Sequence, residues 1–226
     1  TDKRLFLYDP ALQGGKLTSY VTYTDDGKNW SEPQPVYKPT YIFWKPVAVG
    51  DRFYATAHVK SRDGKSRDVH LITSTDGIAW EQVSKIRGGN WESETTVHFT
   101  SPDRALAFLR QKYGSPQASV LISEAPFTEW TEKPVPGGHF SGHAAYTFAG
   151  KNYFFSRAYD QGRENPQTMV YTFDDQGTMT PYCRFPSGGD CSYPAAVQIG
   201  DELLVSYYST HEGTTDIYLA RGPLKK

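Results

Sequence analysis

Short runs of apolar and β-branched residues, each about a strand in length, alternate along the whole chain with pairs of turn-forming residues. Residues 53–59 and 105–110 are two such runs, and Gly50-Asp51 and Pro102-Asp103 are the turns that precede them. Gly accepts positive φ and Asp can accept hydrogen bonds from nearby amides, so both residues favour tight reversals. No stretch carries the period of an amphipathic helix. The pattern therefore predicts an all-β chain that forms a single domain.

The runs group into five units, about 1–38, 39–88, 89–138, 139–189 and 190–226. The three middle units each contain four predicted strands, whereas the first unit lacks the inner strand and the last lacks the outer strand. In chain order, the predicted strands are 4–8, 19–24 and a segment that ends near 37; 45–49, 53–59, 68–73 and 80–86; 94–99, 105–110, 119–123 and 130–135; 143–148, 153–157, 168–173 and one near 180; and 193–199, 202–208 and 215–220.

A turn cassette recurs between the third and fourth strands of these units. It reads Ser-Thr-Asp-Gly-Ile-Ala-Trp at 74–80 and Thr-Asp-Asp-Gly-Lys-Asn-Trp at 24–30, and worn copies lie at 123–130 and 173–179. Its tryptophans, Trp30, Trp80 and Trp130, are 50 residues apart each time. We expect Asp26 and Asp76 to accept backbone hydrogen bonds in these turns, with Trp30 and Trp80 buried beneath.

This period is typical of β-propellers, because consecutive four-stranded antiparallel units of ~40–50 residues form propeller blades. Gly50, Gly150 and Gly200 mark equivalent first turns. We therefore expect one β-propeller domain of four-stranded antiparallel blades over residues 1–226. Five blades account for these residues, and six would be expected if upstream sequence is missing.

The composition excludes several classes of partner. The formal net charge is −1, and no basic stripe is present, so nucleic acid is not an expected ligand. No apolar run approaches the ~20 residues of a membrane-spanning helix. Aromatic residues make up 15% of the chain, with sixteen tyrosines and two methionines, which suits sheets and recognition surfaces.

The cassettes at 24–30 and 74–80 resemble the Asp-boxes, or BNR repeats, of sialidase-like β-propellers, although they are one residue shorter than the usual form. The closing run from Asp190 to Gly213 also looks like the final blade of bacterial proteins in this glycan-active group. The resemblance implies a glycan ligand or substrate, and we expect a secreted or periplasmic location. Asp-boxes lie away from the active site of these proteins, so the cassette implies the fold and not the chemistry.

One departure from that family limits what it implies. Sialidases carry an early Arg-Ile-Pro motif whose Arg grips the substrate carboxylate. The nearest match here is Trp44-Lys45-Pro46, with Lys in place of Arg. Sialic acid specificity is therefore not carried over to this chain.

Candidate site residues come from aligning the blades on their first turns. The starts of the inner strands give Lys45, Glu94, His143 and Tyr193, at spacings of 49, 49 and 50. The ends of the second strands give His58, Arg110, Arg157 and Tyr208, with His211 and Glu212 just beyond. Four different polar residues at one structural position are unlike a packing solution, so they indicate one asymmetric site at the mouth of the propeller.

Each candidate has a possible role and an ordinary structural alternative. Glu94, or Glu92 two residues earlier, is a candidate acid/base, and either could equally be a solvated carboxylate or a salt-bridge partner. Arg110 and Arg157 could clamp a carboxylate or sulfate, or join blades through salt bridges. His143 and Tyr193 are candidates for proton transfer or nucleophilic attack, but could instead be core or packing residues. Further candidate substrate-binding residues are Lys45, which could bind the anionic group, and His58, Trp44, Tyr208, His211 and Glu212. Trp44, Trp91 and Tyr159 could be platforms for sugar faces or core residues.

Three functions fit this set. The first is a glycoside hydrolase on an acidic or decorated glycan, with Glu94 as acid/base and a second carboxylate among Asp9, Glu92, Asp190 and Glu212. The second is a polysaccharide lyase in which Tyr193 or His143 moves protons while arginines neutralise a uronate. The third is a glycan-binding, lectin-like propeller or an inactive relative; lectins tend to repeat one site in every blade, and these positions differ between blades.

No cofactor or metal is expected. His139 and His143 are four residues apart, but on a strand this separates them by ~13 Å, and no phosphate loop or nucleophile elbow is present. Cys183 and Cys191 are eight residues apart, which leaves both a disulfide and two reduced thiols open.

Overall fold

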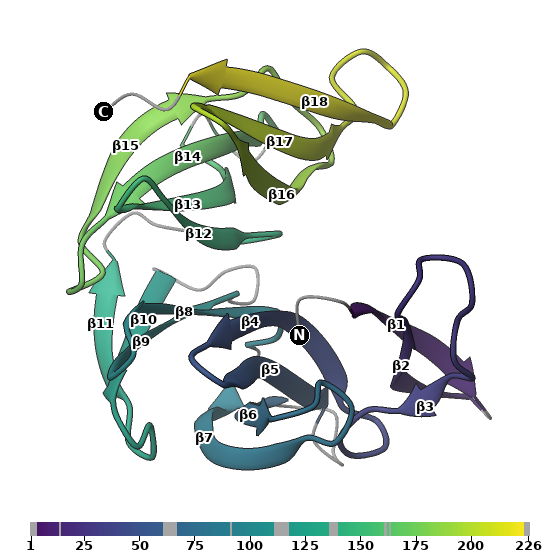
Figure 1. The fold of residues 1–226 in the computed structure, drawn as a ribbon. Coiled ribbons are helices and arrows are strands. Elements are labelled where there is room, and N and C mark those ends of the chain that lie inside the picture. Colours follow the sequence, from purple (N-terminus) through teal and green to yellow (C-terminus); the bar gives the residue numbers. More distant parts are fainter. Residues whose placement is uncertain are drawn as a thin grey trace. The chain divides into compact units, whose positions relative to one another are not determined.

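The computed structural model describes residues 4–13, 15–60, 67–90, 92–110, 118–135, 140–160, 162 and 164–223. These residues contain eighteen β-strands and no helix. The strands form five antiparallel sheets, numbered here as blades 1 to 5 in chain order (Figure 1). The all-β, five-bladed β-propeller class predicted from the sequence is confirmed.

Blade 1 contains β1 (Leu5–Gln13), β2 (Lys16–Thr24) and β3 (Gln34–Pro35). Blade 2 contains β4 (Ile42–Val49), β5 (Arg52–Lys60), β6 (Arg67–Ser74) and β7 (Glu81–Asn90). Blade 3 contains β8 (Thr95–Ser101), β9 (Arg104–Leu109), β10 (Ala118–Glu124) and β11 (Thr131–Val135). Blade 4 contains β12 (Ala144–Phe148), β13 (Lys151–Ala158), β14 (Gln167–Phe173) and β15 (Met179–Arg184). Blade 5 contains β16 (Cys191–Ile199), β17 (Glu202–Ser209) and β18 (Asp216–Pro223).

Each blade is a meander in which strands consecutive in the chain are hydrogen-bonded neighbours. Blades 2, 3 and 4 have four strands, and blades 1 and 5 have three. The cassette at 24–30 follows β2 and the cassette at 74–80 follows β6, so β2 and β6 are both third strands. The first blade therefore lacks an inner strand and the last an outer strand among the described residues, as the sequence pattern predicts.

The chain divides into two compact units, Thr1–Val97 with Pro126–Glu129, and His98–Ala125 with Trp130–Lys226. In the first unit, apolar residues of blades 1 and 2, such as Val21, Phe43 and Ile72, form one buried cluster. The second unit has two clusters, one between blades 3 and 4 around Phe108 and Phe154, and one between blades 4 and 5 around Phe155. Packing between neighbouring sheets is thus the source of each core.

The cassettes fold as predicted at their aspartates. Oδ1 of Asp76 accepts the amides of Ile78 and Ala79, each at 2.8 Å, and Oδ1 of Asp26 accepts those of Lys28 and Asn29 at the same distance. Gly77 has a φ of +77°, and a Cβ there would lie 2.8 Å from the Phe6 ring. Glycine is therefore required at this turn both by the backbone and by the neighbouring blade.

The two tryptophans of these cassettes differ. Trp80 is 9% exposed, and its Nε1 donates to the Gly77 carbonyl at 3.1 Å. Its ring packs against Phe43 at a centroid distance of 4.9 Å. Trp30 is 44% exposed, so the prediction that it is buried is wrong. Trp80 is covered by aromatic side chains of blades 1 and 2, and Trp30 has no such ring contact among the described residues.

Candidate functional site

Two arginines and two tyrosines of the predicted set come together in the second unit. Arg110 directly follows β9, Arg157 lies in β13, Tyr193 in β16 and Tyr208 in β17, so blades 3, 4 and 5 all contribute. We call these four residues the Arg–Tyr cluster. Each of the four is partly exposed, so solvent can reach the cluster.

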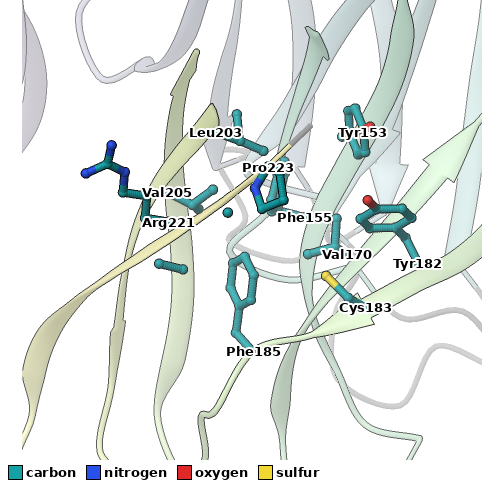
Figure 2. Close-up of a pocket in the computed structure, with 12 residues that line it drawn as sticks. Tyr153, Phe155, Val170, Tyr182, Cys183, Phe185, Leu203, Val205, Arg221 and Pro223 are labelled. Carbon is teal, nitrogen blue, oxygen red and sulfur yellow. The ribbon is translucent and has the colours of Figure 1, made fainter. Parts of the chain in front are cut away.

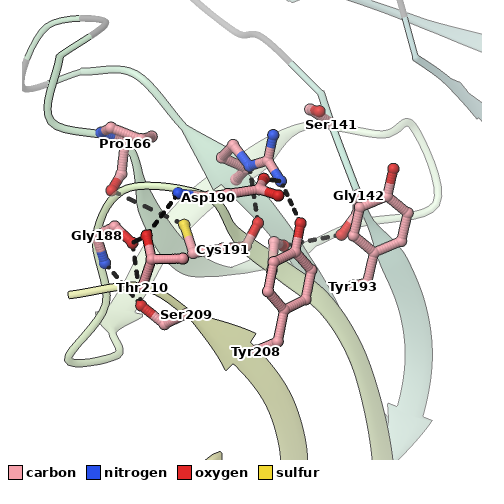
Figure 3. A network of polar contacts seen from close by, with 12 residues as sticks. Ser141, Gly142, Pro166, Gly188, Asp190, Cys191, Tyr193, Tyr208, Ser209 and Thr210 are labelled. Atoms are coloured by element: carbon pink, nitrogen blue, oxygen red, sulfur yellow. Dashed lines mark hydrogen bonds and ion pairs between the residues drawn. The ribbon is translucent and has the colours of Figure 1, made fainter. Parts of the chain in front are cut away.

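Direct hydrogen bonds join the cluster in two pairs. Nη1 of Arg110 donates to the Tyr193 hydroxyl oxygen at 2.7 Å, across 83 residues of sequence. Nη2 of Arg157 donates to the Tyr208 hydroxyl oxygen at 2.9 Å. The two phenol rings stack with centroids 5.9 Å apart and an interplanar angle of 24°. Figure 3 shows the rings of Tyr193 and Tyr208 side by side, with both hydroxyl groups pointing the same way.

Asp190 binds Arg157 from the solvent side. Its Oδ1 accepts Nη2 of Arg157 at 2.6 Å, and the Asp190 side chain is 65% exposed whereas that of Arg157 is 11% exposed. Nε of Arg157 donates to the Cys191 carbonyl at 2.7 Å, which fixes the plane of the guanidinium. A carboxylate therefore already occupies one donor of Arg157, at a position open to solvent.

Electrostatic interactions keep Arg157 charged and Tyr208 neutral. Burial alone would lower the pKa of Arg157, but its hydrogen bond with Tyr159 and the charge of Asp190 raise that pKa above the ordinary value. Burial and a hydrogen bond with Asp190 raise the pKa of Tyr208, against the opposing effect of Arg157. At neutral pH the cluster thus presents a charged guanidinium beside a neutral Tyr208 phenol.

A bulge in β16 places Tyr193. The register of β16 on β17 shifts between Ser192 and Ala195, and Ser192 and Tyr193 have φ values of +102° and +50°. The Tyr193 amide and the Ser192 hydroxyl both donate to the Gly142 carbonyl, at 2.9 and 2.8 Å. Gly142 itself has a φ of +51°, and a Cβ there would lie 2.9 Å from the Tyr193 ring. The start of blade 4 therefore fixes the orientation of Tyr193.

The other candidates of this unit have different surroundings. His143 is completely buried, its Nε2 donates to the Phe108 carbonyl at 2.8 Å, and its ring lies 5.5 Å from that of Phe154. His211 and Glu212 are exposed; Nδ1 of His211 lies 2.9 Å from the Ser209 hydroxyl, and Glu212 accepts the Tyr218 hydroxyl at 2.9 Å. The structure thus places His143 in the core and the other two residues in the loop after β17.

In the first unit, Lys45 and Glu94 form a second polar group. Lys45 lies at a bulge of β4 and has a φ of +35°. Burial lowers the pKa of Lys45 to about 8, against the opposing attraction of Glu94. Trp44 precedes Lys45 in the same bulge and is half-buried. Lys45 and Tyr193 are thus held by similar bulges, each directly before a proline, in the inner strands of their blades.

His58 and Glu92 are buried in this unit. His58 is 4% exposed and lies opposite Ile42 in the pairing of β5 with β4. Glu92 is 3% exposed, and its Oε1 lies 3.5 Å from Nε of Arg87. Its second oxygen, Oε2, has no hydrogen-bond partner among the described residues. Trp91 and His139, which the sequence also singled out, lie outside the described residues.

Sequence reasoning did not identify several contributors to the cluster. Gly142 and Ser192 carry no chemical signal of their own, and only the bulge shows that they orient Tyr193. Asp190 was weighed as a second carboxylate, and its ion pair with Arg157 joins residues 33 apart in sequence. The Ser-Tyr-Pro run at 192–194, which parallels Trp44-Lys45-Pro46, is the one signal that could have indicated the bulge.

The described residues contain no group of three or more His, Cys, Asp or Glu side chains placed to hold a metal ion. They also contain no helix long and apolar enough to cross a membrane. Cys183 and Cys191 are both free thiols, the first exposed and the second buried.

This chain resembles known proteins in its structure. No protein-family model matches the chain, and no curated protein matches it. A protein of unknown function from Dyadobacter fermentans has a TM-score of 0.80 at 20% identity, over 96% of this chain and 67% of that one.

Other similar structures are named as glycan-degrading enzymes. An exo-β-1,3-galactanase from Clostridium thermocellum has a TM-score of 0.59 at 14% identity, over 77% of this chain and 47% of the enzyme. An exo-1,5-α-L-arabinanase from a bovine ruminal metagenomic library has a TM-score of 0.60 at 11% identity, over 100% of this chain and 91% of the enzyme. The chain thus spans under half of the galactanase structure. At these identities the likeness shows a shared fold, that of a five-bladed β-propeller.

Proposed function

We propose that this protein is a carbohydrate-active β-propeller, and specifically a glycoside hydrolase that acts on an acidic or decorated glycan. The observation that carries the proposal is the Arg–Tyr cluster, in which two guanidinium groups and two stacked phenols are held by hydrogen bonds at an accessible place. The names of the structurally similar galactanase and arabinanase support a glycan as the ligand.

Arg157 is the proposed binding group for an acidic sugar. Its Nη2 donates at 2.6 Å to Asp190, whose side chain is 65% exposed and can swing into solvent. A ligand carboxylate or sulfate would then replace Asp190 on the same donor, since guanidinium forms directional hydrogen bonds with the oxygens of both groups. Tyr208 and Tyr193 would contribute hydroxyl groups to sugar oxygens and ring surface to the sugar C–H face.

Glu94 is the proposed acid/base of the hydrolase. A glycoside hydrolase of the usual type needs a carboxyl group that donates a proton to the leaving oxygen and a second carboxylate that acts as nucleophile or base. Glu92 is the proposed second carboxylate in the same unit, because its Oε2 is buried and has no hydrogen-bond partner among the described residues. Lys45, whose pKa burial lowers to about 8, carries a charge that Glu94 attracts.

A screen for cleavage and binding tests this proposal. Parent protein, Glu94→Gln and Arg157→Ala are incubated with acidic and neutral oligosaccharides, and released sugars are measured before binding is titrated. Glu94→Gln keeps the side-chain shape but removes the titratable proton, so it should abolish cleavage and leave binding largely intact. Cleavage by Glu94→Gln at the parental rate would remove Glu94 from the mechanism, and binding without any cleavage by the parent would favour a lectin.

A polysaccharide lyase is the second candidate, favoured by the 2.7 Å hydrogen bond from Arg110 to Tyr193. In this reaction Tyr193, as a phenolate beside Arg110, would take the proton next to a uronate carboxylate, and an arginine would neutralise that carboxylate. The glycosidic oxygen would leave with its electron pair and take up a proton from water. The product is an unsaturated uronate that absorbs ultraviolet light, whereas hydrolysis adds water and gives no such product. Appearance of this absorbance in the same screen would replace the hydrolase with the lyase.

A further inference from the structure

The guanidinium of Arg157 is surrounded by hydrogen-bond partners. Its Nε donates to the Cys191 carbonyl at 2.7 Å, and its Nη2 donates to the Tyr208 hydroxyl oxygen at 2.9 Å and to Asp190 at 2.6 Å. A further hydrogen bond joins Arg157 to Tyr159. The Arg157 side chain is 11% exposed, so these contacts decide what can bind it. A ligand anion therefore reaches this guanidinium by replacing one of the partners.

Asp190 is the partner whose side chain is most open to solvent. It is 65% exposed, whereas Cys191 is buried and contributes a backbone carbonyl of β16. The Tyr208 ring is held by stacking on Tyr193. The Asp190 carboxylate accepts Nη2 of Arg157 and is also hydrogen-bonded with the Tyr208 hydroxyl. Asp190 thus occupies two groups that an incoming carboxylate or sulfate would use.

The backbone on either side of Asp190 is fixed. The Asp190 amide donates to Oγ1 of Thr210 at 2.9 Å, and that hydroxyl donates to the Gly188 carbonyl at 3.2 Å (Figure 3). Gly189 has a φ of +61°, and a Cβ there would clash with Oγ1 of Thr210. The Asp190 side chain can therefore turn away from Arg157 by rotation about its own bonds, while the loop keeps its place.

A carboxylate attached beside Arg157 competes with every free anion. Its effective concentration is about millimolar or higher, because the backbone holds it next to the guanidinium. The apparent dissociation constant of a ligand equals the intrinsic constant divided by the fraction of molecules in which the site is open. This fraction is a property of the protein, so the loss of affinity is the same factor for every anion that displaces Asp190.

We propose that Asp190 is an autoinhibitory residue that closes the Arg–Tyr cluster to small free anions and yields to an acidic oligosaccharide. The inference rests on the proposed function for its ligand, and it narrows the substrate class to oligomers. The Tyr193 ring lies 5.9 Å from that of Tyr208, so a long ligand on Arg157 also reaches the second pair, Arg110 and Tyr193. These added contacts offset the loss that Asp190 causes, and a single uronate has too few of them.

Calorimetric titration of the parent, Asp190→Ala and Asp190→Asn tests the proposal. The ligands are acetate, galacturonate, oligogalacturonate and a neutral galactan oligosaccharide. In Asp190→Ala the dissociation constants of all three anions should fall by one common factor, at least about tenfold, and that of the neutral ligand should not change. Asp190→Asn keeps the shape of the side chain without its charge. It should give a smaller gain, and it preserves the test if the alanine variant does not fold.

Glu202→Ala is the matched control, because it removes a carboxylate from another arginine of the same unit and changes the net charge equally. Glu202 accepts Nε of Arg221 at 2.8 Å. The Arg221 side chain is 68% exposed and borders an apolar hollow lined by Leu203 and Val205 (Figure 2). A guanidinium this exposed binds anions weakly, so no anion should gain affinity in Glu202→Ala.

Three results would overturn the role of Asp190: unchanged anion affinity in Asp190→Ala, weaker anion binding in that variant, or an equal gain in Glu202→Ala. If oligogalacturonate nevertheless binds the parent, the proposed function survives such a result. Acetate separates the two proposals in the other direction. A tenfold gain for acetate in Asp190→Ala, with no oligogalacturonate binding to any variant, would support closure by Asp190 and refute the glycan ligand.

Discussion

Asp76 shows how much one side chain does in a cassette. Burial acts to raise its pKa, but hydrogen bonds from Ile78, Ala79 and Ser74 lower the pKa of Asp76 below its ordinary value. The Asp26 pKa is lowered by the corresponding amides of Asn29 and Lys28. In both turns the folded chain stabilises the charged form of the carboxylate, so the turn depends on its ionisation.

Asp76→Ala should lower the free energy of unfolding by about 1–2 kcal/mol, as for loss of a capping carboxylate, and leave glycan binding intact. Because the pKa is lowered on folding, the stabilisation is present above the unfolded pKa of about 4 and is lost as pH falls through the folded pKa. The difference in free energy of unfolding between the parent and Asp76→Asn should therefore shrink from pH 7 to pH 3, as measured by denaturant titration. A difference that stays constant with pH would contradict this account of the turn.

Lys45 should also make stability rise with pH, but in an alkaline range and because burial disfavours its charged form. Its pKa is about 8 in the folded chain and about 10.5 when exposed, so the folded state binds fewer protons between these values. Stability from this residue should rise as pH increases from 8 to 10.5. Melting temperatures of Lys45→Met should lack that rise, whereas Lys28→Met, at an exposed cassette position, should keep it. Identical pH slopes in parent and Lys45→Met would refute the burial of this amine.

At the scale of elements, the bulge of β16 and the loop before β12 act together. Gly142 accepts two hydrogen bonds from the bulge and lies against the Tyr193 ring, so the start of blade 4 and the start of blade 5 hold one another. The bulge gives Ser192 and Tyr193 positive φ values, which costs free energy for residues with a side chain. These contacts at the two strand starts compensate that cost and orient the phenol.

Gly142→Ala should therefore destabilise the protein by more than the backbone strain of alanine at positive φ alone. Alanine at positive φ costs about 1–2 kcal/mol, and Gly150→Ala, with a φ of +73° and open space at its Cβ, isolates that cost. Gly142→Ala should in addition displace the Tyr193 ring and break the hydrogen bond between Arg110 and Tyr193. We therefore expect this variant also to bind the glycan more weakly. Denaturant titration and ligand titration of the two variants measure the difference. Equal destabilisation with unchanged binding in both would show that Gly142 does not position Tyr193.

Strands were the part of this fold that the sequence predicted well. The expected strand 68–73 is observed as β6, Arg67–Ser74, and the expected strand 202–208 as β17, Glu202–Ser209. A strand's two-residue period and the turn residues at its ends are local, so they can be read along the chain. The first blade was less well predicted, because β1 runs from Leu5 to Gln13 and β3 has two residues, Gln34–Pro35.

Contacts between distant residues account for what the sequence could not predict. Arg110 and Tyr193 were named as site candidates, but their hydrogen bond joins residues 83 apart. The burial of Trp80 and the exposure of Trp30 follow from which neighbouring side chains cover each ring, and the two cassettes have the same pattern. The blade alignment predicted where His143 lies along its strand. It could not predict that the rings of Phe140 and Phe154 would pack around the His143 ring.

At the scale of the molecule, the blades repeat their backbone and differ in their chemistry. The cassettes and first turns recur, whereas the ends of the second strands carry different residues: His58 in blade 2, Arg110 and Arg157 in blades 3 and 4, and Tyr208 in blade 5. A repeated scaffold with non-repeated polar residues suits one asymmetric binding site, and we propose the Arg–Tyr cluster of the second unit as that site.

The affinity of an acidic oligosaccharide for Arg157→Ala tests the central claim most directly. Arg184→Ala is the matched control, because Arg184 also pairs with an aspartate, Asp160 at 2.6 Å, and is not one of the four residues of the cluster. Calorimetric titration with oligogalacturonate, and with neutral galactan oligosaccharides for comparison, gives the numbers. We expect Arg157→Ala to bind the acidic ligand at least about tenfold more weakly and Arg184→Ala to bind it as the parent does. Equal affinities in all three proteins would contradict the assignment of the Arg–Tyr cluster as the glycan site.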